Sequence, residues 1–366
     1  MMKVPFVDLQ AQYKTIKPRV DQAIAEVLAA AAFIGGDAVA DFEAEFAGLT
    51  GTGYAVGCAN GTDALEIALE ALGVGPGDEV LVPAYTWVST ASAVVRVGAM
   101  PVFVDVHADY YTLDPDLLSQ AVTASTKAII PVHFYGLPAD MPAIMALAKK
   151  YKLKVIEDCA QAHGAMIGRQ PVATFGDLAT FSFYPGKNLG AYGDGGAIVT
   201  NDRALADKCR VIARLGQQGK HNHVQVGRNS RLDALQAAVL RAKLPMLEEW
   251  TARRRWVARQ YAMQFADLKI KTQRIPADFK HVYHLYVVQV DKRDGLRKYL
   301  QEKGIQTQIH YPKPLNQLGV FADKRPQKVA DAMADRLLSL PMYPEMTREQ
   351  VDYVAAMVKK FIVYGG

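Results

Sequence analysis

VIEDCAQAHGAMIGRQPVATFGDLATFSFYPGKNLGAYGDGGAIVTN, residues 155–201, is the stretch from which the fold of this chain can be predicted. It holds three short apolar runs, each short enough to be a buried strand. Glu157 and Asp158 end the first run, and Lys187 lies between the second and the third, among glycines and aromatic residues. Such surroundings indicate a lysine with a chemical role, while a solvated lysine in a glycine-rich loop is the alternative.

Length and composition favour a globular protein of about two domains. The chain has 366 residues, of which 50% are hydrophobic and 22% are charged, so it can bury a sizeable core. A formal charge of +5 is small for this length and does not favour nucleic-acid binding, although a locally basic mouth for a phosphate-bearing substrate is compatible with it. Three cysteines without a CxxC pair indicate a reducing compartment and no zinc site, so we expect no metal.

Nothing in the sequence favours membranes or nucleic acid as partners. The first residues, MMKVPFVDLQAQY, contain no apolar core of a secretory signal. The most apolar stretch, 27–36, is far shorter than the roughly 20 residues of a spanning helix, so we expect a cytoplasmic protein. The arginines at 253–255 and 259 favour a solvated, salt-bridged helix face over a nucleic-acid surface, because no aromatic platform accompanies them.

Strand and helix patterns alternate along the first 200 residues. This alternation predicts a largely parallel sheet covered by helices on both faces. Beyond residue 201 long helical patterns follow, and from about residue 250 they mix again with short strands, one expected at 306–310, and a helix expected at 328–338. We therefore expect a large domain over residues 1–249 and a small α/β domain over 250–366.

The polar residues that follow the strands suggest a cofactor with a pyridine ring. Asp158 ends a predicted central strand, where open α/β sheets place ligand sites, and a carboxylate there can pair with a protonated ring nitrogen. Lys187 would then form a Schiff base through a neutral, partly desolvated amine. Gln161 can bond a phenolic ring oxygen. A helix N-cap role for Asp158 and a solvated loop position for Gln161 are the alternatives.

A phosphate site is predicted at the start of the helix that follows residue 60. Free N–H groups at a helix N-terminus favour an anion, and Gly61 allows close approach of the backbone. Thr62 and, from another strand, Ser182 would add hydroxyls, although Thr62 or Asp63 would also serve as a plain helix cap. Trp87 would stack on the ring, with core packing as its alternative.

Seven motifs together resemble the DegT/DnrJ/EryC1/StrS family of sugar aminotransferases. They occur in the family's order and lie mostly within the first 240 residues. The motifs are FIGGDAVADFEAEFA (33–47), CANGTDAL (58–65), GDEVLVPAYTWVST (77–90), VIEDCAQAHGA (155–165), GDLATFSFYPGKNLGAYGDGGAIVTND (176–202), GRNSRLDALQAAVL (227–240) and, more weakly, IHYPKPLN (309–316). The last departs from the family's usual PLH, which leaves the sugar contacts of that loop open.

The resemblance implies a fold type I enzyme that depends on pyridoxal 5′-phosphate (PLP). Its large domain would hold a mostly parallel seven-stranded sheet, as in aspartate aminotransferase, beside a small C-terminal α/β domain. Lys187 would bind PLP covalently, Asp158 would meet the pyridine nitrogen, Gln161 the ring oxygen and Trp87 the ring face. Gly61, Thr62 and Ser182 would bind the phosphate.

The resemblance also implies a homodimer with shared active sites and a transaminase reaction. Asn229 would reach the phosphate bound by the neighbouring subunit. Lys187 would move the proton in both half-reactions, first with L-glutamate and then with a nucleotide-linked keto-sugar. Members that carry histidine in place of the lysine perform a deoxygenation, so Lys187 favours transamination.

A dTDP-3-keto-6-deoxyhexose, converted to a dTDP-3-amino-3,6-dideoxyhexose, is the substrate that the motifs resemble most. Such sugars enter O-antigens, S-layers or antibiotics, and the sequence does not choose among them. Candidate substrate contacts are Phe33, His163, Tyr184, His223, His310 and Tyr311. The alternatives are a helix-end staple for Phe33, plain packing for His163 and Tyr184, and an ordinary strand end for His310 and Tyr311.

Three other hypotheses stay open. Two are transfer to a 4-keto-6-deoxyhexose and transfer to a UDP-3-keto-hexuronic acid derivative, the latter needing an extra cation for the sugar carboxylate. The third is a non-catalytic regulatory protein on the same fold. An NAD-dependent enzyme is disfavoured because no GxGxxG motif follows a strand at the start of a βαβ unit.

Overall fold

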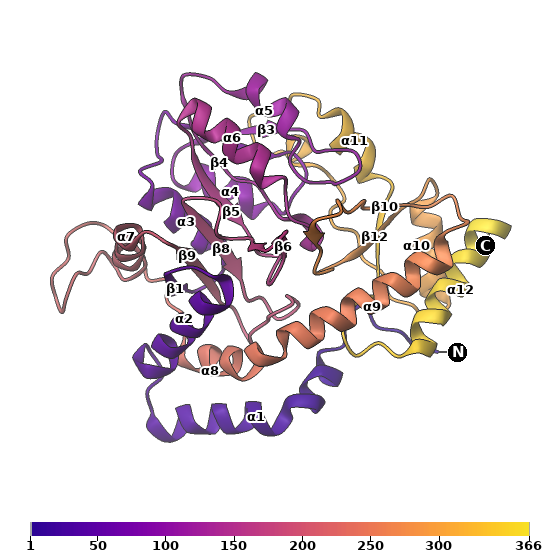
Figure 1. Ribbon diagram of the computed structural model, residues 1–366, viewed down its shortest axis with the longest axis horizontal. Coiled ribbons are helices and arrows are strands. Elements are labelled where there is room, and N and C mark those ends of the chain that lie inside the picture. The colour runs from indigo at the N-terminus through magenta and orange to yellow at the C-terminus, as the bar shows by residue number, and fades with distance from the viewer. Residues whose placement is uncertain (1, 366) are drawn as a thin grey trace.

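A seven-stranded sheet lies at the centre of the first 200 residues (Figure 1). The computed structural model describes residues 2–365. In spatial order the strands are β1 (Tyr54–Cys58), β9 (Gly196–Thr200), β8 (Leu178–Ser182), β5 (Lys154–Asp158), β4 (Thr126–Ile129), β2 (Glu79–Pro83) and β3 (Met100–Val104). All paired strands run parallel except β9, which is antiparallel to both of its neighbours. The expected large, mostly parallel sheet is confirmed.

Alternating side chains of each strand pack into two separate core layers, one on each face of the sheet. In β8, Leu178 packs into one apolar cluster, whereas Ala179 and Phe181 pack into another. Successive strand residues point to opposite faces, so a strand that is apolar throughout needs cover on both sides. On one side lie α3 (Gly61–Ala71), α4 (Ser89–Arg96) and α7 (Arg203–Ala213), and on the other α2 (Gly36–Thr50), α5 (Pro115–Ala121), α6 (Met141–Tyr151) and α8 (Ala234–Lys243), with α1 (Leu9–Ala30) packed outside α2 and α8.

A second, antiparallel sheet organises the C-terminal part. It consists of β10 (Lys271–Thr272), β12 (Tyr286–Gln289) and β13 (Leu337–Leu340), and it packs with α9 (Leu247–Phe265), α10 (Arg293–Glu302) and α12 (Arg348–Tyr364). The remaining elements are β6 (Met166–Ile167), β7 (Gln170–Pro171), β11 (Phe279–Lys280), α11 (Lys328–Ala334) and the 3-10 turns at Phe134–Gly136, Leu244–Met246 and Leu315–Gln317.

Helix α9 connects the two regions and runs diagonally across the molecule in Figure 1. The expected domain boundary at 249/250 lies in its first turn, and the division into two domains stays a proposal. Val4 packs into the C-terminal cluster, so the first residues contact the second region. Arg254 is buried in α9 and donates to the carbonyls of Tyr283, His284 and Met342, so the expectation of a solvated, salt-bridged face is wrong for this arginine.

Two expectations about the C-terminal elements are also wrong. Residues 306–310 form no strand, because only Gln308 pairs there, with Ser339. The expected helix at 328–338 stops at Ala334, and β13 begins three residues later. Apolar residues at 337–340 continue the helical pattern, but they are buried against β12, whose pairing decides their conformation.

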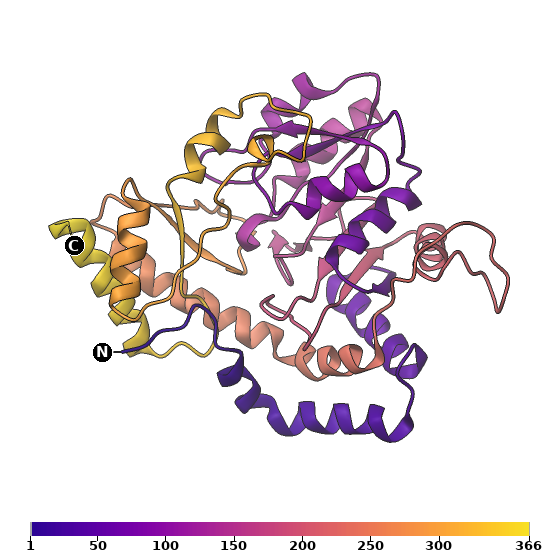
Figure 2. The ribbon, with the colours of Figure 1, turned by 180° about the vertical axis from the view of Figure 1, so that it is seen from behind.

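The connection between α7 and α8 extends away from the body of the molecule, at the left of Figure 1 and, from behind, at the right of Figure 2. Several of its apolar side chains are exposed, most of all Val226 at 95%. Within residues 2–365, no helix combines the length and apolar character needed to cross a membrane.

Candidate active site

The carboxyl ends of β1, β2, β5 and β8 open into one cavity of about 910 Å³. These ends meet because parallel strands present the same end at the same edge of a sheet, and open α/β sheets place ligand sites there. Segments from the C-terminal region close the other side. Of the residues singled out in the sequence, the structure brings ten together around this cavity: Gly61, Thr62, Trp87, Asp158, Gln161, Ser182, Tyr184, Lys187, His310 and Tyr311.

Asp158 ends β5 as a buried carboxylate with few partners. Its Oδ2 accepts from the Thr90 hydroxyl at 3.0 Å, and its Oδ1 accepts from the Ala160 amide at 3.1 Å. Burial raises the pKa of Asp158, while these two hydrogen bonds and the charge of Lys187 lower it in part. No helix starts at Asp158, so the helix-cap alternative is wrong. A cationic hydrogen-bond donor in the cavity would satisfy this carboxylate.

Lys187 lies in the connection from β8 to β9 and lines the same cavity. Burial lowers the pKa of its amine to about 8, and the negative charge of Asp158 opposes this shift. A lysine with this pKa supplies a neutral nucleophile near pH 7 far more often than a solvated lysine does. The two side chains thus share one space and influence each other's charge.

The N-terminus of α3 also lines the cavity. Asn60 caps the helix, because its side chain accepts from the Asp63 amide at 2.9 Å. Thr62 and Asp63 are therefore free of the capping role that was their alternative. Thr62 Oγ1 lies 2.7 Å from Ser89 Oγ, and a Cβ on Gly61 would lie 2.7 Å from Ser182 Cβ. Only glycine allows the helix end and Ser182 to approach so closely, as an anion cradle requires.

Gln161 and Trp87 present different surfaces to the middle of the cavity. The Gln161 Oε1 accepts from the Tyr135 amide at 2.7 Å, so its NH₂ group is directed towards the Tyr311 hydroxyl, 3.4 Å away. Trp87 is 53% exposed, with its ring 5.1 Å from that of Tyr311, and Tyr184 is 60% exposed. Core packing, the alternative for both Trp87 and Tyr184, is therefore wrong.

Four predicted site residues lie outside the cavity of this chain. Phe33 is exposed between α1 and α2. His223 is exposed in the projecting loop, where its Nδ1–H donates to the Leu215 carbonyl at 2.9 Å. Asn229 is exposed at the base of that loop, paired through its backbone with Arg214.

His163 is the fourth, and its position favours packing over substrate contact. The ring is buried against Phe181 and Phe183, and neither nitrogen has a hydrogen-bond partner among residues 2–365. Burial, followed by the charge of Lys187, lowers its pKa to about 3. A neutral imidazole with this burial has no access to the cavity in the single chain.

Several residues that the sequence analysis did not single out also line the cavity. Among them are Phe6, Val7, Asp63 (named above only as a helix cap), Ser89, Asp194, His284, Gln308 and Met342. Asp63, Ser89 and Asp194 lie inside the quoted motifs, which could have pointed to them. The others come from the first residues and from the C-terminal region, outside the quoted motifs. His284 Nδ1 faces Asn188 Oδ1 at 3.3 Å, and burial, followed by Lys187, holds its pKa well below the usual value.

Asn316, the residue that replaces the family's usual histidine, has a structural role. It is buried, and its Nδ2 donates to the Arg325 carbonyl at 3.2 Å and to Asp331 Oδ1 at 3.1 Å. It does not line the cavity. Within this chain, Asn316 is therefore not placed to contact a sugar in the cavity.

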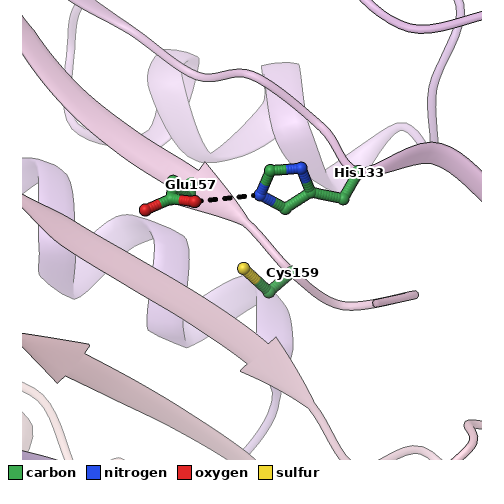
Figure 3. A group of neighbouring side chains, drawn as sticks. All are labelled: His133, Glu157 and Cys159. Atoms are coloured by element: carbon green, nitrogen blue, oxygen red, sulfur yellow. Dashed lines mark hydrogen bonds and ion pairs between the residues drawn. The ribbon is translucent and has the colours of Figure 1, made fainter. Parts of the chain in front are cut away.

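Behind the cavity, His133, Glu157 and Cys159 form a buried group of the kind that can ligate a metal (Figure 3). The Glu157 carboxylate accepts four hydrogen bonds, from His133 Nε2 at 3.1 Å and from the amides of Ala173, Phe175 and Gly176 at 2.8–2.9 Å. His133 Nδ1 accepts from the Ala139 amide at 3.0 Å, so Nε2 carries the proton. Both residues are already satisfied, and the group is a hydrogen-bond network that supports β5.

Comparison with known proteins assigns the chain to a family. The profile of the DegT/DnrJ/EryC1/StrS aminotransferase family matches residues 14–359. The chain belongs to this family. The family, the fold and the transaminase class that the motifs implied are thereby confirmed.

This family member is similar to enzymes that act on different nucleotide sugars. It is 46% identical over 359 residues to the UDP-N-acetyl-3-dehydro-alpha-D-glucosamine 3-aminotransferase of Acidithiobacillus ferrooxidans, with 98% of this chain and 97% of that protein covered. It is 43% identical over 364 residues to the dTDP-3-amino-3,4,6-trideoxy-alpha-D-glucose transaminase of Streptomyces venezuelae, with 98% and 96% covered. The solved structure of NtdA from Bacillus subtilis with bound cofactor PMP has a TM-score of 0.93 at 32% identity and covers 99% of this chain and 86% of that one.

Pyridoxal phosphate is the cofactor, and the cavity fits it. Asp158 is a buried carboxylate whose raised pKa calls for a cationic partner, which a protonated pyridine nitrogen supplies. The close approach of Gly61 and Ser182 beside the N-terminus of α3 suits an anion. Lys187 lines the same cavity. One cavity therefore holds groups that suit the ring nitrogen, the aldehyde and the phosphate of the cofactor.

Proposed function

We propose that this aminotransferase moves the amino group of L-glutamate to the C3 keto group of a nucleotide-linked hexose, with a dTDP-3-keto-6-deoxyhexose as the first candidate. The observation that carries the proposal is that Lys187 and Asp158 line one cavity of about 910 Å³. That volume is at the upper end of small-molecule sites, larger than a cofactor alone needs. The names of two similar enzymes, one acting on a UDP-sugar and one on a dTDP-sugar, both place the amino group at C3.

Each residue has a defined task in this proposal. Lys187 binds PLP covalently, Asp158 accepts the hydrogen bond of the ring nitrogen, and Gln161 donates its NH₂ to the ring oxygen. Trp87 covers one ring face. The phosphate lies against Gly61, Thr62 and Ser182.

Proton transfer is the task of Lys187. When bound, PLP supplies an electron-withdrawing ring that stabilises negative charge on the carbon that loses its proton. The Lys187 Nζ would remove that proton and return it on the other side of the amino nitrogen, moving it between the substrate carbon and C4′ of PLP, in one direction with glutamate and in the other with the sugar. An amine with a pKa of about 8 can both accept and release a proton near neutral pH.

Within one chain, the residues around the cavity offer few cations for an anionic substrate. Among the described lining residues, Lys187 is the single lysine or arginine, whereas Asp63, Asp158 and Asp194 are acidic. A carboxylate at sugar C6 would meet no cation supplied by this chain. A neutral C6, as in a 6-deoxyhexose or an N-acetylhexosamine, needs no such cation, whereas a hexuronic acid would need one from the second subunit.

The same charges support a homodimer with shared active sites. A nucleotide diphosphate and the carboxylates of glutamate need cations that one chain does not provide in its cavity. The projecting loop between α7 and α8 carries exposed Val224 and Val226 and leads into Asn229 (Figure 1). Exposed apolar side chains on a projecting loop favour contact with a second copy. We propose that Asn229 contacts the phosphate bound by the neighbouring subunit.

A substrate panel tests the reaction. The PLP-loaded enzyme is incubated with L-glutamate and, in turn, dTDP-3-keto-6-deoxyhexose, its 4-keto isomer, UDP-3-keto-N-acetylglucosamine and the UDP-3-keto-hexuronic acid. Mass spectrometry and NMR identify the amino sugar. Amination of a 3-keto sugar is expected, whereas exclusive use of the 4-keto isomer would refute the C3 assignment.

The dimer and the regulatory alternative have separate tests. Inactive Lys187→Ala and Asn229→Ala chains, mixed and re-associated, should regain part of the activity if each site uses both subunits. A protein that binds PLP but aminates no sugar in the panel would favour the regulatory alternative. The cytoplasmic location stays a prediction, in accord with three cysteines that are free and buried.

A further inference from the structure

The segment that carries Lys187 is folded tightly on itself between β8 and β9. The Lys187 amide donates to the Tyr184 carbonyl, and the Ala191 amide donates to the Phe183 carbonyl, both at 2.8 Å. At Gly190 a Cβ would lie 2.4 Å from the Pro185 carbonyl oxygen, so no side chain fits there. We call residues 184–193 the lysine loop. Its backbone position decides where the Lys187 amine lies.

Lys243, the last residue of α8, contacts this loop without lining the cavity. Its side chain is completely buried, and its Nζ donates to the Gly190 carbonyl at 2.7 Å. The ammonium also lies 4.0 Å from the ring centre of Tyr192, over its face. In the described part of the chain, 2–365, no carboxylate forms a salt bridge with it. Burial lowers the pKa of Lys243 to about 8, and the charge of Glu345 opposes this shift.

Gln236 gives the loop a second attachment to the same helix. Its Oε1 accepts from the Tyr192 amide at 2.9 Å, and a Cβ on Gly193 would lie 3.0 Å from its Nε2. Positions seven apart in a helix lie on one face, so Gln236 and Lys243 present their polar atoms to the loop together. Helix α8 is itself packed against α1 and α2, which makes it a firm support.

A buried lysine without an ion pair requires a reason. Removing an ammonium from water is costly, and an apolar residue of similar shape would fill the space more cheaply. An apolar residue, however, would leave the Gly190 carbonyl without this charged donor. Charge-assisted hydrogen bonds are about twice as strong as neutral ones, and this one acts three residues from Lys187.

We propose that Lys243 is a positioning residue for transamination, whose bond to the Gly190 carbonyl holds the lysine loop so that the Lys187 amine stays directed into the cavity. The inference rests on the proposed role of Lys187 and adds a residue that touches neither cofactor nor substrate. A displacement of about 1 Å at a reacting group can lower a rate by about 100-fold. A loosened loop is therefore expected to slow the chemistry more than it weakens binding.

The test compares Lys243→Met with Lys208→Met in the PLP-loaded enzyme. Lys208 is the control for the loss of a bond from a lysine to a carbonyl: its Nζ donates to the backbone carbonyl of Ala71 at 2.6 Å, but it is exposed on α7 and does not line the cavity. Hydrogen exchange of the 184–193 peptide and single-turnover reaction with L-glutamate are measured for both. For Lys243→Met we expect at least about tenfold faster exchange in that peptide alone and a glutamate rate about 10–100-fold lower, with KM within about twofold. Lys208→Met should match the wild type in both.

Each result of these measurements supports or overturns the role proposed for Lys243. Unchanged exchange in the 184–193 peptide, or a rise spread over the whole chain, would overturn the proposal, because the first shows no anchoring and the second shows only general stability. If Lys243→Met does not fold, Lys243→Gln, which keeps a neutral donor on a side chain one atom shorter, should show smaller changes of the same kind. If the wild type itself does not react with L-glutamate, the proposed amino donor is wrong, while the exchange data still judge Lys243.

Discussion

Capture of PLP by the apoenzyme is expected to depend on pH through the amine of Lys187. Only the neutral amine has the lone pair that attacks the aldehyde of PLP. Burial lowers the pKa of this amine to about 8, and the negative charge of Asp158 acts in the opposite direction by raising the pKa. The informative perturbation is therefore Asp158→Asn, which removes the charge and keeps the burial.

The expected size of the effect follows from these shifts. With a pKa of about 8, roughly one amine in ten is neutral at pH 7, against about three in ten thousand for an unperturbed lysine. At saturating PLP the capture rate of the wild type should rise about tenfold per pH unit and level off near pH 8. In Asp158→Asn the plateau should begin at lower pH, because the one charge that stabilises the ammonium is gone.

Stopped-flow absorbance of apoenzyme mixed with PLP between about pH 6 and pH 10 measures both profiles. Asp194→Asn is the control, because Asp194 lines the same cavity but does not contribute to the pKa shift of Lys187. Its profile should match that of the wild type. A wild-type rate that keeps rising to pH 10, or an unchanged midpoint in Asp158→Asn, would refute the inference that a buried amine and this carboxylate share the site.

Three further substitutions have distinct expected outcomes. Lys187→Ala should keep the wild-type circular dichroism spectrum and lose both half-reactions by at least about 10²–10⁴-fold, and substantial residual turnover would reject its catalytic assignment. Glu157→Gln should lower the free energy of unfolding in urea by about 2–6 kcal/mol, because an amide cannot accept all four hydrogen bonds. If His133, Glu157 and Cys159 hold no metal, a chelator should not change the free energy of unfolding of the wild type. Gly61→Ala should weaken PLP affinity in equilibrium dialysis, because the new Cβ forces Ser182 away; an unchanged affinity would show that the phosphate lies elsewhere.

Local patterns were sufficient to predict which strand ends meet around the cavity. Gly61, Asp158 and Ser182 each lie at or just after the carboxyl end of a strand, and their convergence follows from parallel pairing of those strands. Lys187 follows one of the same strands. At these strand ends, the sequence therefore predicted both where a residue lies and which chemical group it offers.

The same patterns could not predict which side chains point into the cavity. His163 lies only two residues beyond Gln161 after β5, yet its ring turns into the core against Phe181 and Phe183. The turn after the strand decides which residue faces the cavity, and its geometry depends on packing with the neighbouring strand. Phe33 and His223 were likewise candidate substrate contacts, and they lie outside the cavity of one chain.

By itself, the sequence determined the sheet, the strand ends that carry the cofactor residues, and the family, because apolar periodicity and short motifs depend on neighbours close along the chain. Tertiary structure alone decided that the two chain ends close the cavity and that Lys243 reaches the lysine loop from another element. Those contacts join residues far apart in sequence, and such contacts form only where separate elements pack together. Local preference therefore specifies which groups are available, and packing specifies which of them meet.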